Sequence, residues 1–74
     1  SAQNIHLALI NHYVAKKTEA IAMIELLYNK SFAISEHTNI IDETRKWVEI
    51  LDQSESCINT LNGLFKEPQT LDGE

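Results

Sequence analysis

Three histidines are the residues of this chain that most readily suggest chemistry, because imidazole is the commonest metal ligand in proteins. They are His6, His12 and His37. Two ligands on one helix share an ion when they are one turn apart, whereas His6 and His12 are six residues apart and His12 and Glu19 are seven apart. We therefore predict no metal site, and we expect these histidines to face solvent.

The single cysteine, Cys57, is the one candidate nucleophile for covalent catalysis. A reactive cysteine needs a neighbouring base and an electropositive setting, but Cys57 has Glu55 two residues before it and apolar Ile58 after it. No glycine-rich phosphate loop and no paired base accompany it. We therefore predict that the protein is not an enzyme and that it carries no cofactor.

The charge of the chain argues against a nucleic-acid or membrane partner. The formal net charge is -5 over 74 residues, which repels phosphate backbones and anionic headgroups. The longest apolar cluster, 20–28, is too short to span a bilayer, so we expect no membrane segment. The alternative function is a small regulator of a nucleic-acid process. It would bind DNA or RNA through the basic residues Lys16, Lys17, Arg45 and Lys46.

One cysteine cannot form an internal disulfide, which fits a reducing, cytoplasmic compartment better than an extracellular one. The chain begins at Ser1 without a methionine, as an excised domain would, so missing targeting signals decide nothing about its compartment.

The elements that must position these residues are helices. Both glycines, Gly63 and Gly73, and the only proline, Pro68, fall in the last twelve positions. Nothing before them readily stops a helix. We predict an all-α protein with a single helical domain over 1–66 and a flexible C-terminal tail over 67–74.

The first predicted helix covers about 4–29. Its apolar residues follow a heptad repeat, with Leu7, Val14, Ile21 and Tyr28 seven residues apart and Ile10 and Ile24 between them. Lys17 is the charged residue in this stripe. A break near Thr18, which would give a three-helix bundle, is the alternative fold.

The second predicted helix covers about 36–63, with Ser35 as its N-cap. Phe32 and Ile34 in the connection are expected to cover the end of the core. The helix should end near Gly63, which can adopt the left-handed conformation. Its stripe has an unbroken 4-3 spacing through Ile40, Thr44, Trp47, Leu51, Ser54, Ile58, Leu61 and Phe65.

Together the stripes predict an antiparallel helical hairpin with its core between the two helices. The predicted core residues are Val14, Ile21, Ile24, Tyr28, Ile40, Trp47, Leu51, Ile58 and Leu61. Trp47 is expected to be mostly buried near the centre of the hairpin.

The first helix carries more apolar surface than one partner helix can cover. The residues predicted to form an interface on it are Ile5, Leu9, Ala15, Ala22, Met23 and Leu26. We therefore predict a non-enzymatic protein–protein interaction module that dimerises into a four-helix bundle, or binds a partner helix, as an adaptor, regulator or chaperone.

Overall fold

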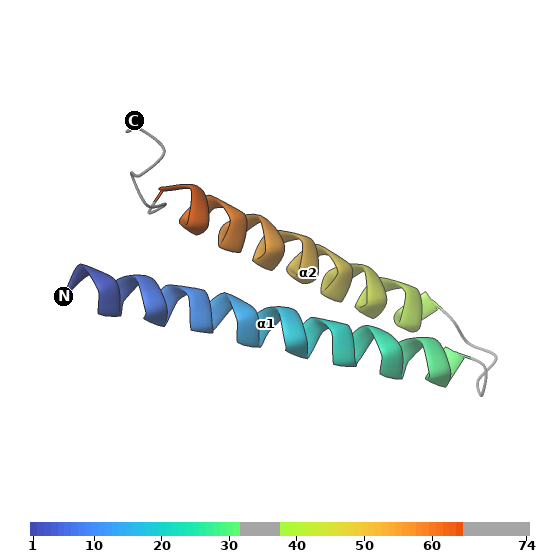
Figure 1. Ribbon diagram of the computed structural model, residues 1–74. Coiled ribbons are helices and arrows are strands. Elements are labelled where there is room, and N and C mark those ends of the chain that lie inside the picture. The colour runs from blue at the N-terminus through green and yellow to red at the C-terminus, as the bar shows by residue number, and fades with distance from the viewer. Residues whose placement is uncertain (32–37, 65–74) are drawn as a thin grey trace.

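The computed structural model describes residues 1–31 and 38–64, which form two antiparallel helices lying side by side (Figure 1). Helix α1 is Ala2–Ser31 and helix α2 is Thr38–Leu64. The predicted all-α hairpin is confirmed. Helix α1 extends two residues beyond each predicted end, and α2 ends one residue later than predicted. Ser35, Phe32, Ile34, Phe65 and the 67–74 tail lie outside the described residues.

Ser1 fixes the start of α1. Its side-chain Oγ accepts a hydrogen bond from the backbone N–H of Asn4 at 3.3 Å, and its carbonyl accepts one from Ile5 at 3.1 Å. A serine in this N-cap position satisfies N–H groups that the first turn cannot pair internally. The helix therefore begins two residues before the predicted start at residue 4.

Helix α1 runs without interruption through Thr18. The Thr18 hydroxyl donates a hydrogen bond to the carbonyl of Val14 at 2.9 Å, so it pairs with the preceding turn and does not cap a new helix. The alternative prediction of a three-helix bundle with a break at this residue is wrong.

The stripe predicted for α2 is confirmed over its described length. Each of its residues from Ile40 to Leu61 is buried or half-buried, and Ser54 is the most buried of them. Thr44 donates a hydrogen bond to the carbonyl of Ile40 at 2.6 Å, again within the helix. Trp47 is only half-buried, less than predicted, and its indole N–H is covered without a hydrogen-bond acceptor.

The predicted left-handed cap at Gly63 is wrong. Gly63 lies inside α2, which continues to Leu64, and no described glycine has a positive φ. Leu64 is a good helix former and continues the helix, so the left-handed turn that glycine permits is not formed here.

The seam between the helices uses a narrower part of α1 than predicted. Ala20 has no exposed surface and Leu27 is 7% exposed, and both lie in a row whose members are all buried or half-buried. This seam row of α1 comprises His6, Ile10, Tyr13, Lys17, Ala20, Ile24 and Leu27. It has the 4-3 spacing of a helix contact, and the small Ala20 lets the two backbones approach closely.

Three predicted core residues are therefore outside the core of the hairpin. Val14, Ile21 and Tyr28 are 44%, 39% and 62% exposed, so their predicted place in the seam is wrong. They lie one position beyond Tyr13, Ala20 and Leu27, which places them about 100° around the helix, on the flank of the contact. The predicted core residues Ile24, Leu51, Ile58 and Leu61 are half-buried and Ile40 is buried.

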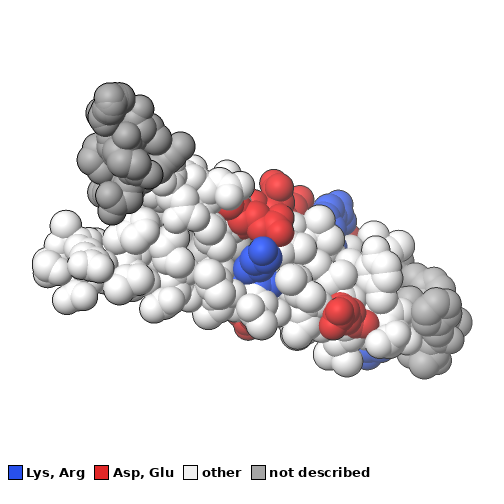
Figure 2. Space-filling model, viewed as in Figure 1, with Lys and Arg blue, Asp and Glu red and all other residues white. Residues whose placement is uncertain are grey.

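No helix in the described part of the chain is long and apolar enough to cross a membrane. Figure 2 shows one broad face of the hairpin, on which uncharged surface predominates and acidic and basic groups meet near the middle of the helices. The residues that make up this pattern are described next.

Candidate interaction surfaces

An exposed apolar surface flanks the seam on one side. On α1 it consists of the heptad row Leu7, Val14, Ile21 and Tyr28, and on α2 of Ile41 and Val48. We call these six residues the heptad face. Each of the six is between 39% and 62% exposed, so the hairpin by itself covers about half of every side chain.

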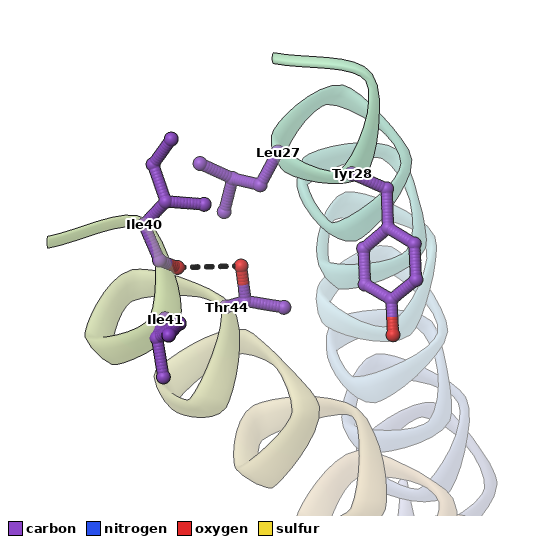
Figure 3. Close-up of a pocket in the computed structure, with 5 residues that line it drawn as sticks. All are labelled: Leu27, Tyr28, Ile40, Ile41 and Thr44. Carbon is purple, nitrogen blue, oxygen red and sulfur yellow. Dashed lines mark hydrogen bonds between the residues drawn. The ribbon is translucent and has the colours of Figure 1, made fainter. Parts of the chain in front are cut away.

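A shallow groove shows that the two helices contribute to the same flank. It is lined by Leu27, Tyr28, Ile40, Ile41 and Thr44 (Figure 3). Leu27 and Ile40 point toward each other across the seam, whereas Tyr28 and Ile41 lie outside that contact. Ile21 and Val48 lie two turns further along their helices on the same side, because residues seven apart nearly align on an α-helix.

An ion pair between the helices lies in the middle of the heptad face. The Nζ atom of Lys17 is 3.6 Å from Oε2 of Glu55, and the two side chains are 40% and 49% exposed. Glu55 follows Val48 by seven residues, and Lys17 falls between Val14 and Ile21. A second groove, lined by these two residues with Ile58 and Asn59, confirms that the pair opens onto this flank.

The opposite flank has a second apolar groove near the open end of the hairpin. It is lined by Leu9, Tyr13, Cys57, Thr60 and Leu61. The Tyr13 hydroxyl is hydrogen-bonded to Cys57, and this bond, together with the nearby sulfur charge and a little desolvation, raises the pKa of Tyr13 above its ordinary value of 10.0. Among the described residues, the side chains that line this groove include no basic or cationic group.

The residues predicted as an interface lie at the edge of the seam and on the outer side of α1. Leu9 lines the groove near Cys57, and Met23 is half-buried at the edge of the seam. Leu26, with Ala15 and Ala22, lies on the side of α1 turned away from α2. Leu26 is 57% exposed and Ile5 is 65% exposed. Their part in an interface stays a prediction.

The four basic residues considered for nucleic-acid binding are each paired with a carboxylate. Lys16 is 3.3 Å from Glu19, and Lys46 is 3.3 Å from Glu43. Arg45 is paired with Asp42, and Lys17 with Glu55. Three of these pairs are within one helix at i, i+3 spacing, so the cations are neutralised locally and do not combine into a basic groove.

The histidines show no ligand geometry among the described residues. No group of three or more His, Cys, Asp or Glu side chains in 1–31 and 38–64 is placed to hold a metal ion. The His12 ring contacts the Tyr13 ring edge to face, with centroids 4.9 Å apart. His37 lies outside the described residues.

Comparisons with protein-family models, with curated proteins and with solved structures find no match to this chain. The function must therefore be inferred from the surfaces of the hairpin.

Proposed function

We propose that this protein is a non-enzymatic protein–protein interaction module, a helical hairpin that acts as an adaptor, regulator or chaperone through contact with another helical chain. The observation that carries the proposal is the small amount of burial. Among the described residues the buried apolar side chains are Ala20, Leu27 and Ile40, and no large side chain is fully buried.

The shape of the hairpin explains why so little is buried. Its smallest dimension is 15 Å, close to the diameter of about 10–12 Å of one helix with its side chains. Stable domains place at least two layers of secondary structure around a core, and this hairpin supplies one layer. A second pair of helices from another chain would provide the missing layer and complete a four-helix bundle.

The exposed apolar side chains provide the energy for such a contact. Ten large apolar side chains in the described residues are exposed. Burying one of them completely is worth about 1.5–3 kcal/mol, so covering even half of the remaining surface of several would offset the cost of association. A monomer would leave this surface in water, which soluble proteins rarely do over a continuous patch.

The alternative function, direct binding of DNA or RNA, has no structural feature in its favour. The basic residues that would contact phosphate already have carboxylate partners, and a dimer would carry about twice the net charge of -5.

Concentration-dependent unfolding tests the proposal. We expect the melting temperature measured by circular dichroism to rise with protein concentration, because association stabilises the folded chain by mass action. Sedimentation equilibrium on the same samples should show a species larger than the 8.4 kDa chain. A monomer that melts cooperatively at one temperature over a wide concentration range, and that captures no helical partner, would contradict the proposal.

A further inference from the structure

We propose that the occupant of the heptad face is a second copy of this chain. The two hairpins stack face to face with their Ser31 and Thr38 ends together, so that α1 of one copy lies over α2 of the other. This inference rests on the proposed function, because it names the partner and the surface of the same interaction module.

The area of the heptad face matches what a stable dimer needs. An aromatic side chain offers about 150–250 Å² and a branched aliphatic one somewhat less, and the six residues are each between 39% and 62% exposed. They therefore present on the order of 500 Å² per copy, or about 1,000 Å² in total, which reaches the smallest area expected of a specific interface.

The charge of the face fits a copy of the same chain. Lys17 and Glu55 are the ionised side chains at its centre, and they already neutralise each other at 3.6 Å. Glu25 lies at the rim, in a groove shared with Tyr28. A nearly neutral surface neither repels its own copy nor selects a strongly basic or acidic partner, even though the whole chain has a net charge of -5.

The order of residues along α2 determines the orientation of the copies. At seven-residue intervals this row reads Ile41, Val48, Glu55 and Asn62, so only its first half is apolar. In the other possible stacking, the Ser31 and Thr38 ends of the two copies lie at opposite ends of the assembly. This would place α2 over α2 and set Val48 against the Glu55 carboxylate of the second copy. Burying a carboxylate against an apolar side chain is costly, which disfavours this arrangement.

Stacking with those ends together places Val14 at the level of the Glu55 carboxylate of the other copy, but it also brings Lys17 of the same helix close to that carboxylate, so Glu55 gains a second cation. A two-fold axis parallel to the helices keeps every residue at its own level along the hairpin, and it exchanges α1 for α2 across the interface. Tyr28 and Ile21 of one copy then face Ile41 and Val48 of the other. Lys17 of each copy comes to the level of Glu55 of the other, so the four charges form one neutral cluster.

This central cluster would fix the register of the dimer. Apolar rows alone permit sliding by a turn, whereas a displaced register would bury the Lys17–Glu55 pair of each copy against apolar side chains and not against the pair of the other copy. The ion pair that is half-exposed in one hairpin thus becomes the feature that specifies a single assembly.

Matched aspartate substitutions test the surface. Ile21→Asp places a charge on the heptad face, and Leu26→Asp places the same charge on the side of α1 turned away from α2. By sedimentation equilibrium we expect the parent and Leu26→Asp to be dimeric. We expect Ile21→Asp to raise the dissociation constant by about 100-fold or more, because it buries an unpaired charge in the interface.

A complementary pair tests the orientation and remains informative if either single variant fails to fold alone. Ile21→Asp mixed with Val48→Lys gives a heterodimer in which the two substituted positions face each other at one contact, while the equivalent second contact stays native. We expect each variant alone to be monomeric and the equimolar mixture to regain helicity and dimer mass. A mixture that shows no recovery overturns the proposed arrangement.

The remaining outcomes separate this inference from the proposed function. If the parent is dimeric and Leu26→Asp dissociates it while Ile21→Asp does not, the heptad face is the wrong surface but the chain is still an interaction module. If the parent is a helical monomer at every concentration, the second copy is excluded as the partner. The proposed function then fails too only if that monomer also melts independently of concentration and captures no helical chain.

Discussion

Lys17 and Glu55 join the two helices through an ion pair of 3.6 Å, whereas the pairs Lys16–Glu19 and Lys46–Glu43 lie within single helices. Lys17 is the charged residue of the apolar stripe in α1, and its partner shows why a charge is tolerated there. The ammonium group reaches past the seam to the flank, where it stays half-exposed.

The Lys17–Glu55 pair should contribute little to the hairpin itself. A double-mutant cycle with Lys17→Ala and Glu55→Ala, measured by urea unfolding at low protein concentration, should give a coupling energy of about 0.2–1 kcal/mol, as for other exposed pairs. The Lys16→Ala and Glu19→Ala cycle is the control within one helix. A coupling well above that range in the dilute protein would show that the pair is already desolvated without a partner.

Ala20 is wholly buried in the contact between the helices, so enlarging it should be destabilising. Ala20 has no exposed surface, and Ala22 in the same helix is exposed. Ala20→Leu should lower the free energy of unfolding by about 1–3 kcal/mol, whereas Ala22→Leu should change it by no more than about 0.5 kcal/mol. Urea unfolding followed by circular dichroism measures both. Equal effects would place Ala20 outside the contact.

The continuity of α1 predicts opposite results for two substitutions at Thr18. Thr18→Pro removes a helix N–H and clashes with the preceding turn, which should cost about 3 kcal/mol. Thr18→Ala removes a β-branched residue at an exposed position and should stabilise by about 0.5 kcal/mol. Thermal unfolding of the two variants tests this. A proline variant as stable as the parent would mean that α1 is interrupted at this point.

Replacing Gly63 with a residue that has a side chain should stabilise the protein. It lies in α2 with an ordinary negative φ, and a Cβ built on it meets nothing within 4 Å. Gly63→Ala should therefore raise the free energy of unfolding by about 0.5–1 kcal/mol. Ala22→Gly, at an exposed position of α1, is the reverse control, and it should lower the free energy of unfolding by a similar amount. Loss of stability in Gly63→Ala would instead support the left-handed cap.

The hydrogen bond between Tyr13 and Cys57 predicts a pH dependence. It raises the pKa of Tyr13 above 10.0, so the folded chain holds this proton more tightly than the unfolded chain does. The stabilisation is therefore complete below pH 10 and is lost as the pH rises through the raised value in the folded state.

Tyrosinate absorbance during an alkaline titration measures this effect. In a Tyr28→Phe background only Tyr13 titrates as a tyrosine, and Cys57→Ala in the same background should bring its midpoint down toward the unperturbed value. An unchanged midpoint would show that the bond to Cys57 does not hold the proton.

The sequence was sufficient to predict the hairpin for two reasons. The helix-breaking residues fall in the last twelve positions, and the second helix has a clear stripe. Helix α2 has one stripe of 4-3 spacing from Ile40 to Leu61, and the structure confirms that this stripe is the part of α2 that is buried against α1. The start of α1 was predicted too late because the apolar pattern does not reveal that Ser1 caps the helix.

The face of α1 was harder to predict for a physical reason. Its apolar arc includes both the row of Tyr13, Ala20 and Leu27 and the row of Val14, Ile21 and Tyr28. Periodicity shows the width of such an arc, but it cannot tell which part a single neighbour covers. In the structure the first row is buried or half-buried and the second row is exposed. Val14, Ile21 and Tyr28 of the heptad face were therefore assigned to the core, and the surface that they help to form was missed.

The thin core has a consequence for the lifetime of the protein. With burial concentrated at Ala20, Leu27, Ile40 and Ser54, an unpartnered chain has little to hold its helices closed against local opening. Proteases cleave the chain in these locally open states at a rate proportional to the population of those states. Under the proposed assembly, chains made in excess of their partners would be degraded first, so the amount of protein would adjust to the number of complexes without a separate regulator.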